Sequence, residues 1–347
     1  MVIFGIIYHA IGGFAAGSFY LPLKKLKEWS WESGWLVNGI FSWILAPIIV
    51  AVITVPSLFS VITDAPGVSV FWTYFFGVLW GIGGLTFGLS VRYLGMSLGY
   101  AVALGFCAAF GTIIPTVHDG TFMKLLTTLS GGVVLGGILA CLAGIAVCGH
   151  AGRLKEKAMA SYTEEKREFN VGRGILVAGF AGVMSACMAF ALHAGKPIAD
   201  NAAAAACGSL WVNNASLVVI LLGGFTTNVI WCVWLNVKNG SGKDYTNKKA
   251  PLSKNYLFAA VAGITWYLQF MFYGMGSTKM GAYDFASWTL HMSFIIIASN
   301  LWSLYLKEWK DSGPKATKTL VAGIGVIALS TVLIGLGGYL EGAAAAH

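Results

Sequence analysis

Long apolar stretches alternate with short polar connections along almost the whole chain. Each stretch has about the 20 residues that an α-helix needs to cross a bilayer, and the runs are continuous, which disfavours a β-barrel. The pattern therefore predicts an all-α membrane protein with ten transmembrane helices. These are Val2–Leu23, Gly34–Val55, Val68–Val91, Leu94–Val117, Gly131–Gly149, Gly174–Ala194, Leu210–Val237, Tyr256–Met275, Tyr283–Leu306 and Leu320–Leu340.

The composition excludes several classes of protein. Of the 347 residues, 57% are hydrophobic and only 10% are charged, whereas a soluble domain carries about 25% charged residues. A soluble enzyme and a nucleic-acid-binding protein are therefore excluded, and the lipid bilayer is the expected surrounding. The six cysteines have no C-x-x-C spacing, so we expect no disulfide framework, no metal and no cofactor. The oligomeric state is not specified.

Basic residues predict the orientation of the helices, because cytoplasmic loops are enriched in Lys and Arg. If the chain starts outside, 19 of its 22 Lys and Arg residues fall in cytoplasmic loops. The loops on the other side of the membrane then contain only Lys124, Lys196 and Lys279. We therefore expect both termini outside the cytoplasm. The net charge of +8 is then a topology signal. Arg92, Lys24 and Lys25 are interpreted as anchors at inner helix ends, with an inner gate as the alternative.

The charged segment near the middle divides the chain into two halves. We expect a five-helix repeat over 1–150, a basic cytoplasmic linker over 151–173, a second five-helix repeat over 174–341 and a tail over 342–347. At an offset of 186 residues, Trp80 aligns with Trp266 and Gly88 with Gly274. Because five is an odd number, the second repeat would be inverted, which places a substrate site near the midplane. Chance alignment of glycine-rich helices is the alternative.

Few ionisable residues fall at membrane depth, where such groups are candidates for function. Asp284 is the acidic residue placed within a predicted helix, and Trp288 and His291 follow at spacings that share its face. His9 in the first helix lies at a depth similar to that of His291. We predict that Asp284, His291 and His9 couple transport to protons. Capping of the ninth helix by Asp284 and structural roles for the histidines are the alternatives.

A neutral substrate would need flat aromatic faces and polar tips. Such groups are supplied by Gln269, Trp266, Tyr267, Tyr273, Trp288, Tyr283, Trp80 and Asn228. Trp and Tyr are also enriched at bilayer interfaces, and we assign that role to Trp29, Trp31, Trp35, Trp302 and Trp309. Asn228 serves equally well as a substrate ligand or as a bond between helices.

Four longer segments carry a family resemblance. They are Phe19–Glu32 (FYLPLKKLKEWSWE), Gly88–Ser97 (GLSVRYLGMS), Trp266–Phe270 (WYLQF) and Tyr283–Phe294 (YDFASWTLHMSF). Together they strongly resemble the bacterial L-rhamnose–proton symporters of the drug/metabolite transporter superfamily, over nearly the whole chain. The resemblance implies a ten-helix protein of the bacterial inner membrane that imports L-rhamnose or a related deoxy sugar with protons. His9, Gln269, Asp284 and His291 lie within family-like segments, but the resemblance assigns them no roles.

One departure from the family pattern bears on the substrate. After Trp80-Gly81-Ile82-Gly83, the family has two asparagines where this chain has Gly84 and Thr86, which leaves the exact sugar open. We expect a secondary transporter that works by alternating access and is not an enzyme. A drug or metabolite exporter of the same superfamily and a membrane-bound sugar sensor are the alternatives. A membrane enzyme would need a carboxylate cluster or metal set that the sequence lacks.

Overall fold

In the computed structural model, residues 2–159 and 171–344 are described, and for residues 88, 91, 92, 95–98, 100, 159, 171, 282, 283 and 342–344 only the backbone is described. Every secondary-structure element among the described residues is a helix. The first half contains α1 (Val2–Ser18), α2 (Tyr20–Leu23), α3 (Trp31–Gly39), the π-helix η1 (Ile40–Leu45), α4 (Ala46–Thr54), α5 (Leu58–Thr63), α6 (Gly67–His118), α7 (Phe122–Thr127) and α8 (Leu129–Met159). The second half contains α9 (Val171–Ala194), α10 (Lys196–Ala204), α11 (Asn213–Asn239), the 3-10 helix η3 (Ser241–Thr246), α12 (Leu252–Ser277), the 3-10 helix η4 (Gly281–Ala286), α13 (Ser287–Tyr305) and α14 (Gly313–Ala344).

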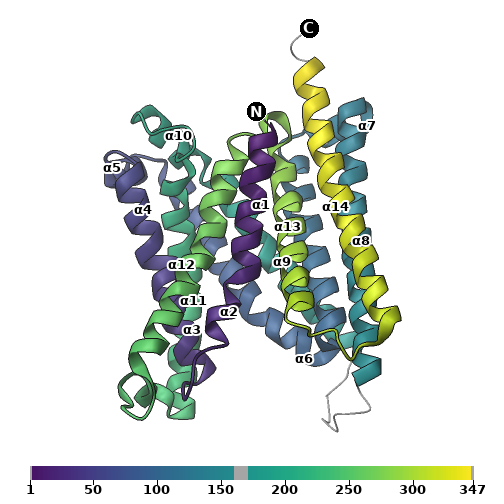
Figure 1. The fold of residues 1–347 in the computed structure, drawn as a ribbon. Coiled ribbons are helices and arrows are strands. Elements are labelled where there is room, and N and C mark those ends of the chain that lie inside the picture. The colour runs from purple at the N-terminus through teal and green to yellow at the C-terminus, as the bar shows by residue number, and fades with distance from the viewer. Residues whose placement is uncertain (1, 160–170, 345–347) are drawn as a thin grey trace.

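The helices form one upright bundle, with the start of α1 and the end of α14 at the same end of it (Figure 1). Helix α1 packs between α12 and α13, and α9 packs along α6. Helix α14 lies along α8, while α11 packs on α6 and on the segment from α3 to α4. Elements of the two halves therefore interdigitate, and the main buried core contains residues from both halves.

Nine helical segments among the described residues are long and apolar enough to cross a membrane. They correspond to nine of the ten predicted helices, so the count of ten is not confirmed. The remaining prediction, Tyr283–Leu306, falls on η4 and α13. Helix α13 is less apolar because its first half, from Ser287 to Ser293, is buried against other helices and includes Ser, Thr and His side chains.

Helix α6 differs from the prediction. Two helices were expected, Val68–Val91 and Leu94–Val117, with Arg92 in a loop between them, but α6 is one continuous helix of 52 residues. It descends through the bundle, changes direction near the lower end and rises again toward α7 (Figure 1). Both predicted crossings correspond to candidate membrane spans within α6, Gly67–Phe87 and Ala101–His118. Only the loop predicted between them was wrong, because a helix tolerates arginine well.

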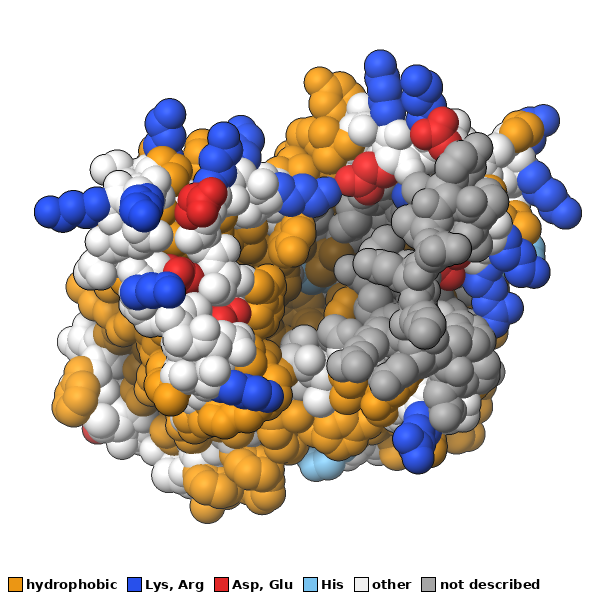
Figure 2. Space-filling view, turned by 90° about the horizontal axis from the view of Figure 1, so that it is seen from below, with side chains coloured by type: hydrophobic (Ala, Val, Ile, Leu, Met, Phe, Trp, Pro, Cys, Tyr) orange, Lys and Arg blue, Asp and Glu red, His pale blue; other side chains and the backbone are white. Residues whose placement is uncertain are grey.

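Helices extend into the predicted linker 151–173, since α8 continues to Met159 and α9 begins at Val171. Residues 160–170 of this linker and 345–347 of the predicted tail lie outside the described residues. The connections that follow α2, α11 and α13 lie at the end of the bundle opposite the termini (Figure 1). Lys24 in the first of these pairs with Glu308 in the last, with 2.9 Å between Nζ and Oε1. Lys and Arg side chains gather on this end face, which is hollowed near its centre (Figure 2).

Candidate functional site

Two histidines from different helices meet in the core of the bundle. The ring centroids of His9 on α1 and His291 on α13 lie 5.9 Å apart, and Tyr273 on α12 lies 5.2 Å from each of them. His9 and His291 are 0% and 2% exposed. The two histidines, for which a similar depth was predicted, are therefore neighbours in the bundle.

The ring nitrogens of this histidine pair lack partners. Neither Nδ1 nor Nε2 of His9 or of His291 has a hydrogen-bond partner among the described residues. Buried polar atoms are bonded in the large majority of cases, so exceptions need an explanation. The four buried ring nitrogens therefore mark this histidine pair as a candidate site.

Glycines make room for the histidine pair. A Cβ atom at Gly276 would lie 2.8 Å from both Cε1 and Nε2 of His9, and one at Gly12 would lie 3.0 Å from Cε1 of His291. Helices α1, α12 and α13 therefore approach closely only because these positions carry no side chain. Gly276 and Gly12 thus leave the space that the rings of His9 and His291 occupy.

We expect Gly276→Ala to lower sugar uptake at an unchanged level of protein in the membrane. The added methyl group would displace the His9 ring, and overpacking of this kind costs about 1–3 kcal/mol, enough to lower uptake roughly tenfold. Gly136→Ala is the matched control, because a Cβ there meets nothing within 4 Å. Uptake of radiolabelled sugar by cells, divided by the amount of the variant in the membrane, measures the effect. Equal uptake by the two variants would contradict the prediction.

Six aromatic side chains form a closed ring, and two of them lie on α12, the helix that also carries Tyr273. Its members, each in contact with the next, are Phe19, Trp35, Trp43, Trp80, Phe270 and Trp266. The centroid distances in that order are 6.3, 5.9, 6.2, 5.4 and 5.9 Å, and Trp266 closes the ring on Phe19 at 4.1 Å. We call these six residues the aromatic ring. It joins the connection between α1 and α2, where Phe19 lies, with α3, η1, α6 and α12, and thus both halves of the chain.

Two indole donors of the aromatic ring have no partner. Nε1 of Trp43 and Nε1 of Trp266 are buried without a hydrogen-bond partner among the described residues. By contrast, Trp35 Nε1 donates to Asn228 Oδ1 at 3.0 Å, and Asn228 Nδ2 donates to the Gly224 carbonyl at 2.9 Å. The ring therefore combines flat apolar faces with two uncommitted donors, while both amide atoms of Asn228 are used within the protein.

The remaining predicted substrate residues fall near these two clusters. Gln269 is 3% exposed and Tyr267 is 1% exposed, and Gln269 Nε2 and the Tyr267 hydroxyl have no partner among the described residues. Trp288 lies 5.7 Å from Tyr273, but its Nε1 already donates to the Cys107 carbonyl at 3.1 Å. The side chain of Tyr283 lies outside the described part of the chain.

The structure corrects the placement of Asp284. It was predicted inside the ninth helix, on one face with Trp288 and His291, but it lies in η4 before α13 begins at Ser287. Its Oδ1 accepts a hydrogen bond from Ser287 Oγ at 3.0 Å, and the residue is exposed. Gly281, with φ of 60°, starts a tight turn here, because this backbone conformation favours glycine. Asp284 therefore lies at the rim of the bundle, before the ninth helix begins.

Sequence reasoning missed three members of the site. Trp35 was assigned to a bilayer interface, and Trp43, which lies in the π-helix, was not singled out; π-helical turns often occur at functional sites. Asn38 is 0% exposed, and neither its Oδ1 nor its Nδ2 has a partner among the described residues. An asparagine in an apolar stretch is itself a signal, and it could have been recognised.

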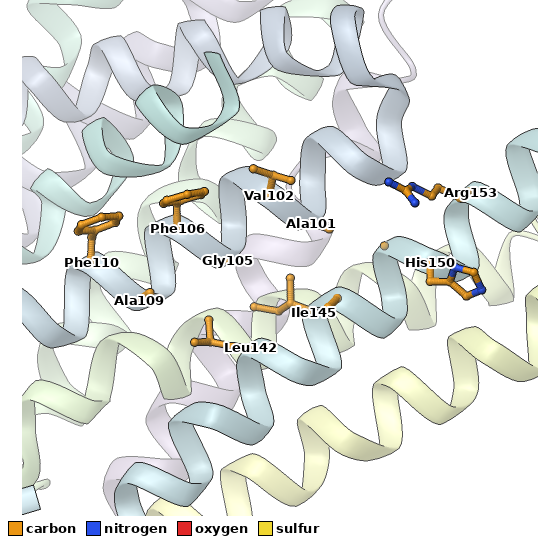
Figure 3. A pocket seen from close by; sticks show the side chains of 12 residues that line it. Ala101, Val102, Gly105, Phe106, Ala109, Phe110, Leu142, Ile145, His150 and Arg153 are labelled. Carbon is orange, nitrogen blue, oxygen red and sulfur yellow. The ribbon is translucent and has the colours of Figure 1, made fainter. Parts of the chain in front are cut away.

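A separate cavity of about 500 Å³ lies between α6 and α8. Its lining is mostly apolar, with Phe106, Phe110, Leu142 and Ile145 along its walls and His150 and Arg153 near one end (Figure 3). It contains none of the predicted site residues. The candidate site is therefore the histidine pair with the aromatic ring, and not this cavity.

Comparisons with known proteins identify the family of this chain. A family model described as "L-rhamnose-proton symport protein (RhaT)" matches residues 1–339. Proteins named "L-rhamnose-proton symporter" from Yersinia pestis (strain Pestoides F) and Yersinia pseudotuberculosis serotype O:1b (strain IP 31758) are each 40% identical over 346 residues, which covers 97% of this chain and 98% of theirs. Such similarity over almost the full length of both proteins shows that the chain belongs to the L-rhamnose–proton symporter family.

Proposed function

We propose that this protein imports L-rhamnose or a closely related deoxy sugar together with protons, across the bacterial cytoplasmic membrane. The observation that carries the proposal is the buried histidine pair, whose ring nitrogens have no hydrogen-bond partner among the described residues, about two turns of α12 from the aromatic ring. The printed name of its relatives, "L-rhamnose-proton symporter", favours import over an exporter or a sensor. The protein would act as a transporter and not as an enzyme, with protons as the coupling ion and no cofactor.

The aromatic ring suits a deoxy sugar. The methyl and C–H groups of such a sugar pack on flat aromatic faces, while its hydroxyl groups need a few well-placed polar partners. Nε1 of Trp43 and of Trp266 can donate to hydroxyl oxygens, and the Gln269 and Asn38 amides can both donate and accept. A bound sugar would thereby satisfy buried polar atoms that have no partner among the described residues.

The histidine pair suits a single proton. Two imidazolium rings with centroids 5.9 Å apart and shielded from water would repel each other strongly, so the pair holds at most one charge. Trp266 and Tyr273 are seven residues apart on α12, which is about 10 Å along the helix. The proton and the sugar would therefore occupy adjacent places, and we expect one proton to move with each sugar. Asp284, at the rim, would receive protons from outside.

The packing of the helices supports alternating access by two inverted repeats. Helix α1 packs on α12 and α13 much as α9 packs along the two arms of α6, and α8 pairs with α14, as a two-fold axis in the membrane plane would require. Trp80 and Trp266, which the repeat aligns, both contact Phe270. With α13 as the tenth crossing, both termini would lie outside, and the hollow on the basic face (Figure 2) would open toward the cytoplasm.

A direct test is the pH of a lightly buffered cell suspension. Adding L-rhamnose to cells that express the protein should make the medium more alkaline, because protons leave it with the sugar. Cells without the protein are the control. Uptake of labelled L-rhamnose without any change in the pH of the medium would contradict coupling to protons.

Residues 84 and 86 should influence which sugar is preferred. A Cβ at Gly84 meets nothing within 4 Å, and the Thr86 hydroxyl donates only to carbonyls of its own helix, at 2.9 and 3.2 Å. We therefore expect the double change Gly84→Asn and Thr86→Asn to fit without disturbing the fold. It should alter the ratio of KM values between L-rhamnose and other sugars by roughly tenfold, which corresponds to one or two hydrogen bonds. Competition by a panel of unlabelled sugars measures the ratio; an unchanged ranking would contradict it.

A further inference from the structure

Three side chains that can bind a metal ion converge at the end of the bundle that carries the termini. His118 is the last residue of α6, Asp119 follows it, and His193 lies in the last turn of α9. Asp119 Oδ1 lies 3.2 Å from His118 Nδ1 and 3.4 Å from His193 Nε2, and the two imidazole centroids are 5.3 Å apart. One ligand atom from each residue lies within 4.8 Å of those of the other two.

We propose that His118, Asp119 and His193 bind a divalent transition-metal ion such as Zn²⁺ or Ni²⁺. Two imidazoles and one carboxylate favour these ions over Mg²⁺ and Ca²⁺, which prefer oxygen ligands alone. At a bond length of about 2.0–2.1 Å, two ligand atoms of a tetrahedral Zn²⁺ ion are about 3.4 Å apart. The two distances to Asp119 Oδ1 already match this value, so a small rotation of the exposed His118 side chain completes the set.

The site is accessible and lies outside both the histidine pair and the aromatic ring. The side chains of His118, Asp119 and His193 are 74%, 41% and 40% exposed, so an ion can reach them from the water phase. None of the three belongs to the histidine pair or to the aromatic ring. The three protein ligands leave a fourth position for water, and the ion would tie the end of α6 to the end of α9.

Metal binding to the purified protein, with any polyhistidine tag removed, tests this proposal. Titration calorimetry with Zn²⁺ should show one site per chain, and Zn²⁺ should raise the unfolding temperature because it binds only the folded state. Co²⁺, as a spectroscopic substitute, should give the absorption bands of a four-coordinate ion. Mg²⁺ at the same concentration should produce none of these signals.

Variants separate the site from other surface histidines. His193→Ala should weaken Zn²⁺ binding at least tenfold, because even the loss of an outer-shell partner typically weakens a metal site 10- to 100-fold, and His118→Ala should do the same. His150→Ala, an exposed histidine near the opposite end of α8, should bind as the unmodified protein does. Sugar uptake without added metal should be unchanged in all three variants, which shows that they fold. Equal Zn²⁺ affinity in His193→Ala and the unmodified protein would overturn the metal site without affecting the proposed transport.

Discussion

Replacing His291 with glutamine should abolish the accumulation of L-rhamnose while leaving its exchange across the membrane intact. With one proton per sugar, a gradient of one pH unit supports roughly tenfold accumulation, and the variant should equilibrate the sugar without accumulating it. Glutamine keeps a polar side chain of similar size but cannot carry a proton. The sugar contacts in the aromatic ring remain, so exchange of labelled for unlabelled sugar persists.

The same experiment distinguishes a pair from two independent residues. His9→Gln should behave as His291→Gln does, and the double variant should lose nothing more, because residues that act as a unit show effects that do not add. His150→Gln is the control, since this exposed histidine lies outside the site. Accumulation by His291→Gln at the level of the unmodified protein would contradict the assigned role of the pair.

Replacing Trp266 with phenylalanine should raise the KM for sugar about tenfold with little change in the maximal rate. Phenylalanine keeps an aromatic face against Phe19 and Phe270 but removes the Nε1 donor, and one hydrogen bond to a neutral group contributes about 0.5–1.5 kcal/mol, which at its upper end is tenfold in affinity. Trp266→Ala should have a larger effect, because it also removes the stacking surface.

A tryptophan on the outside of the bundle supplies the matched control for Trp266. Trp231 on α11 is 43% exposed, so Trp231→Phe makes the same chemical change away from the aromatic ring. Initial rates over a range of sugar concentrations give KM for both variants. If KM is equal in the two variants, the Trp266 indole does not bind the sugar.

The hydrophobic pattern predicted most of the fold because bilayer-spanning helices have a simple requirement in length and polarity. Counting residues from helix ends also placed His9 and His291 at one depth, since the rise of a helix is constant. Neither argument shows which faces of the helices meet. The two histidine rings are neighbours because Gly12 and Gly276 let their helices approach closely. The sequence alone does not show which glycines lie at such contacts.

The wrong predictions have identifiable physical causes. Trp35 was assigned to the bilayer interface because a buried tryptophan and an interfacial one have the same sequence signature; its bond to Asn228 distinguishes them only in three dimensions. Asp284 was placed in a helix because it adjoins an apolar run, although Gly281 two residues before Tyr283 marks a turn. The single helix α6 was divided because a charged residue amid apolar ones is usually found in a loop.

The most direct test of the central proposal is sugar uptake by the purified protein in proteoliposomes under an imposed pH gradient. With the outside acidic, L-rhamnose should enter faster and accumulate above its external concentration, and among deoxy and ordinary sugars it or a close relative should be preferred. Collapsing the pH gradient with a protonophore should end accumulation of the sugar. A sodium gradient imposed in place of the pH gradient should not drive accumulation. Failure of the pH gradient to stimulate uptake of any sugar in the panel would contradict the assignment of this protein as a proton-coupled sugar importer.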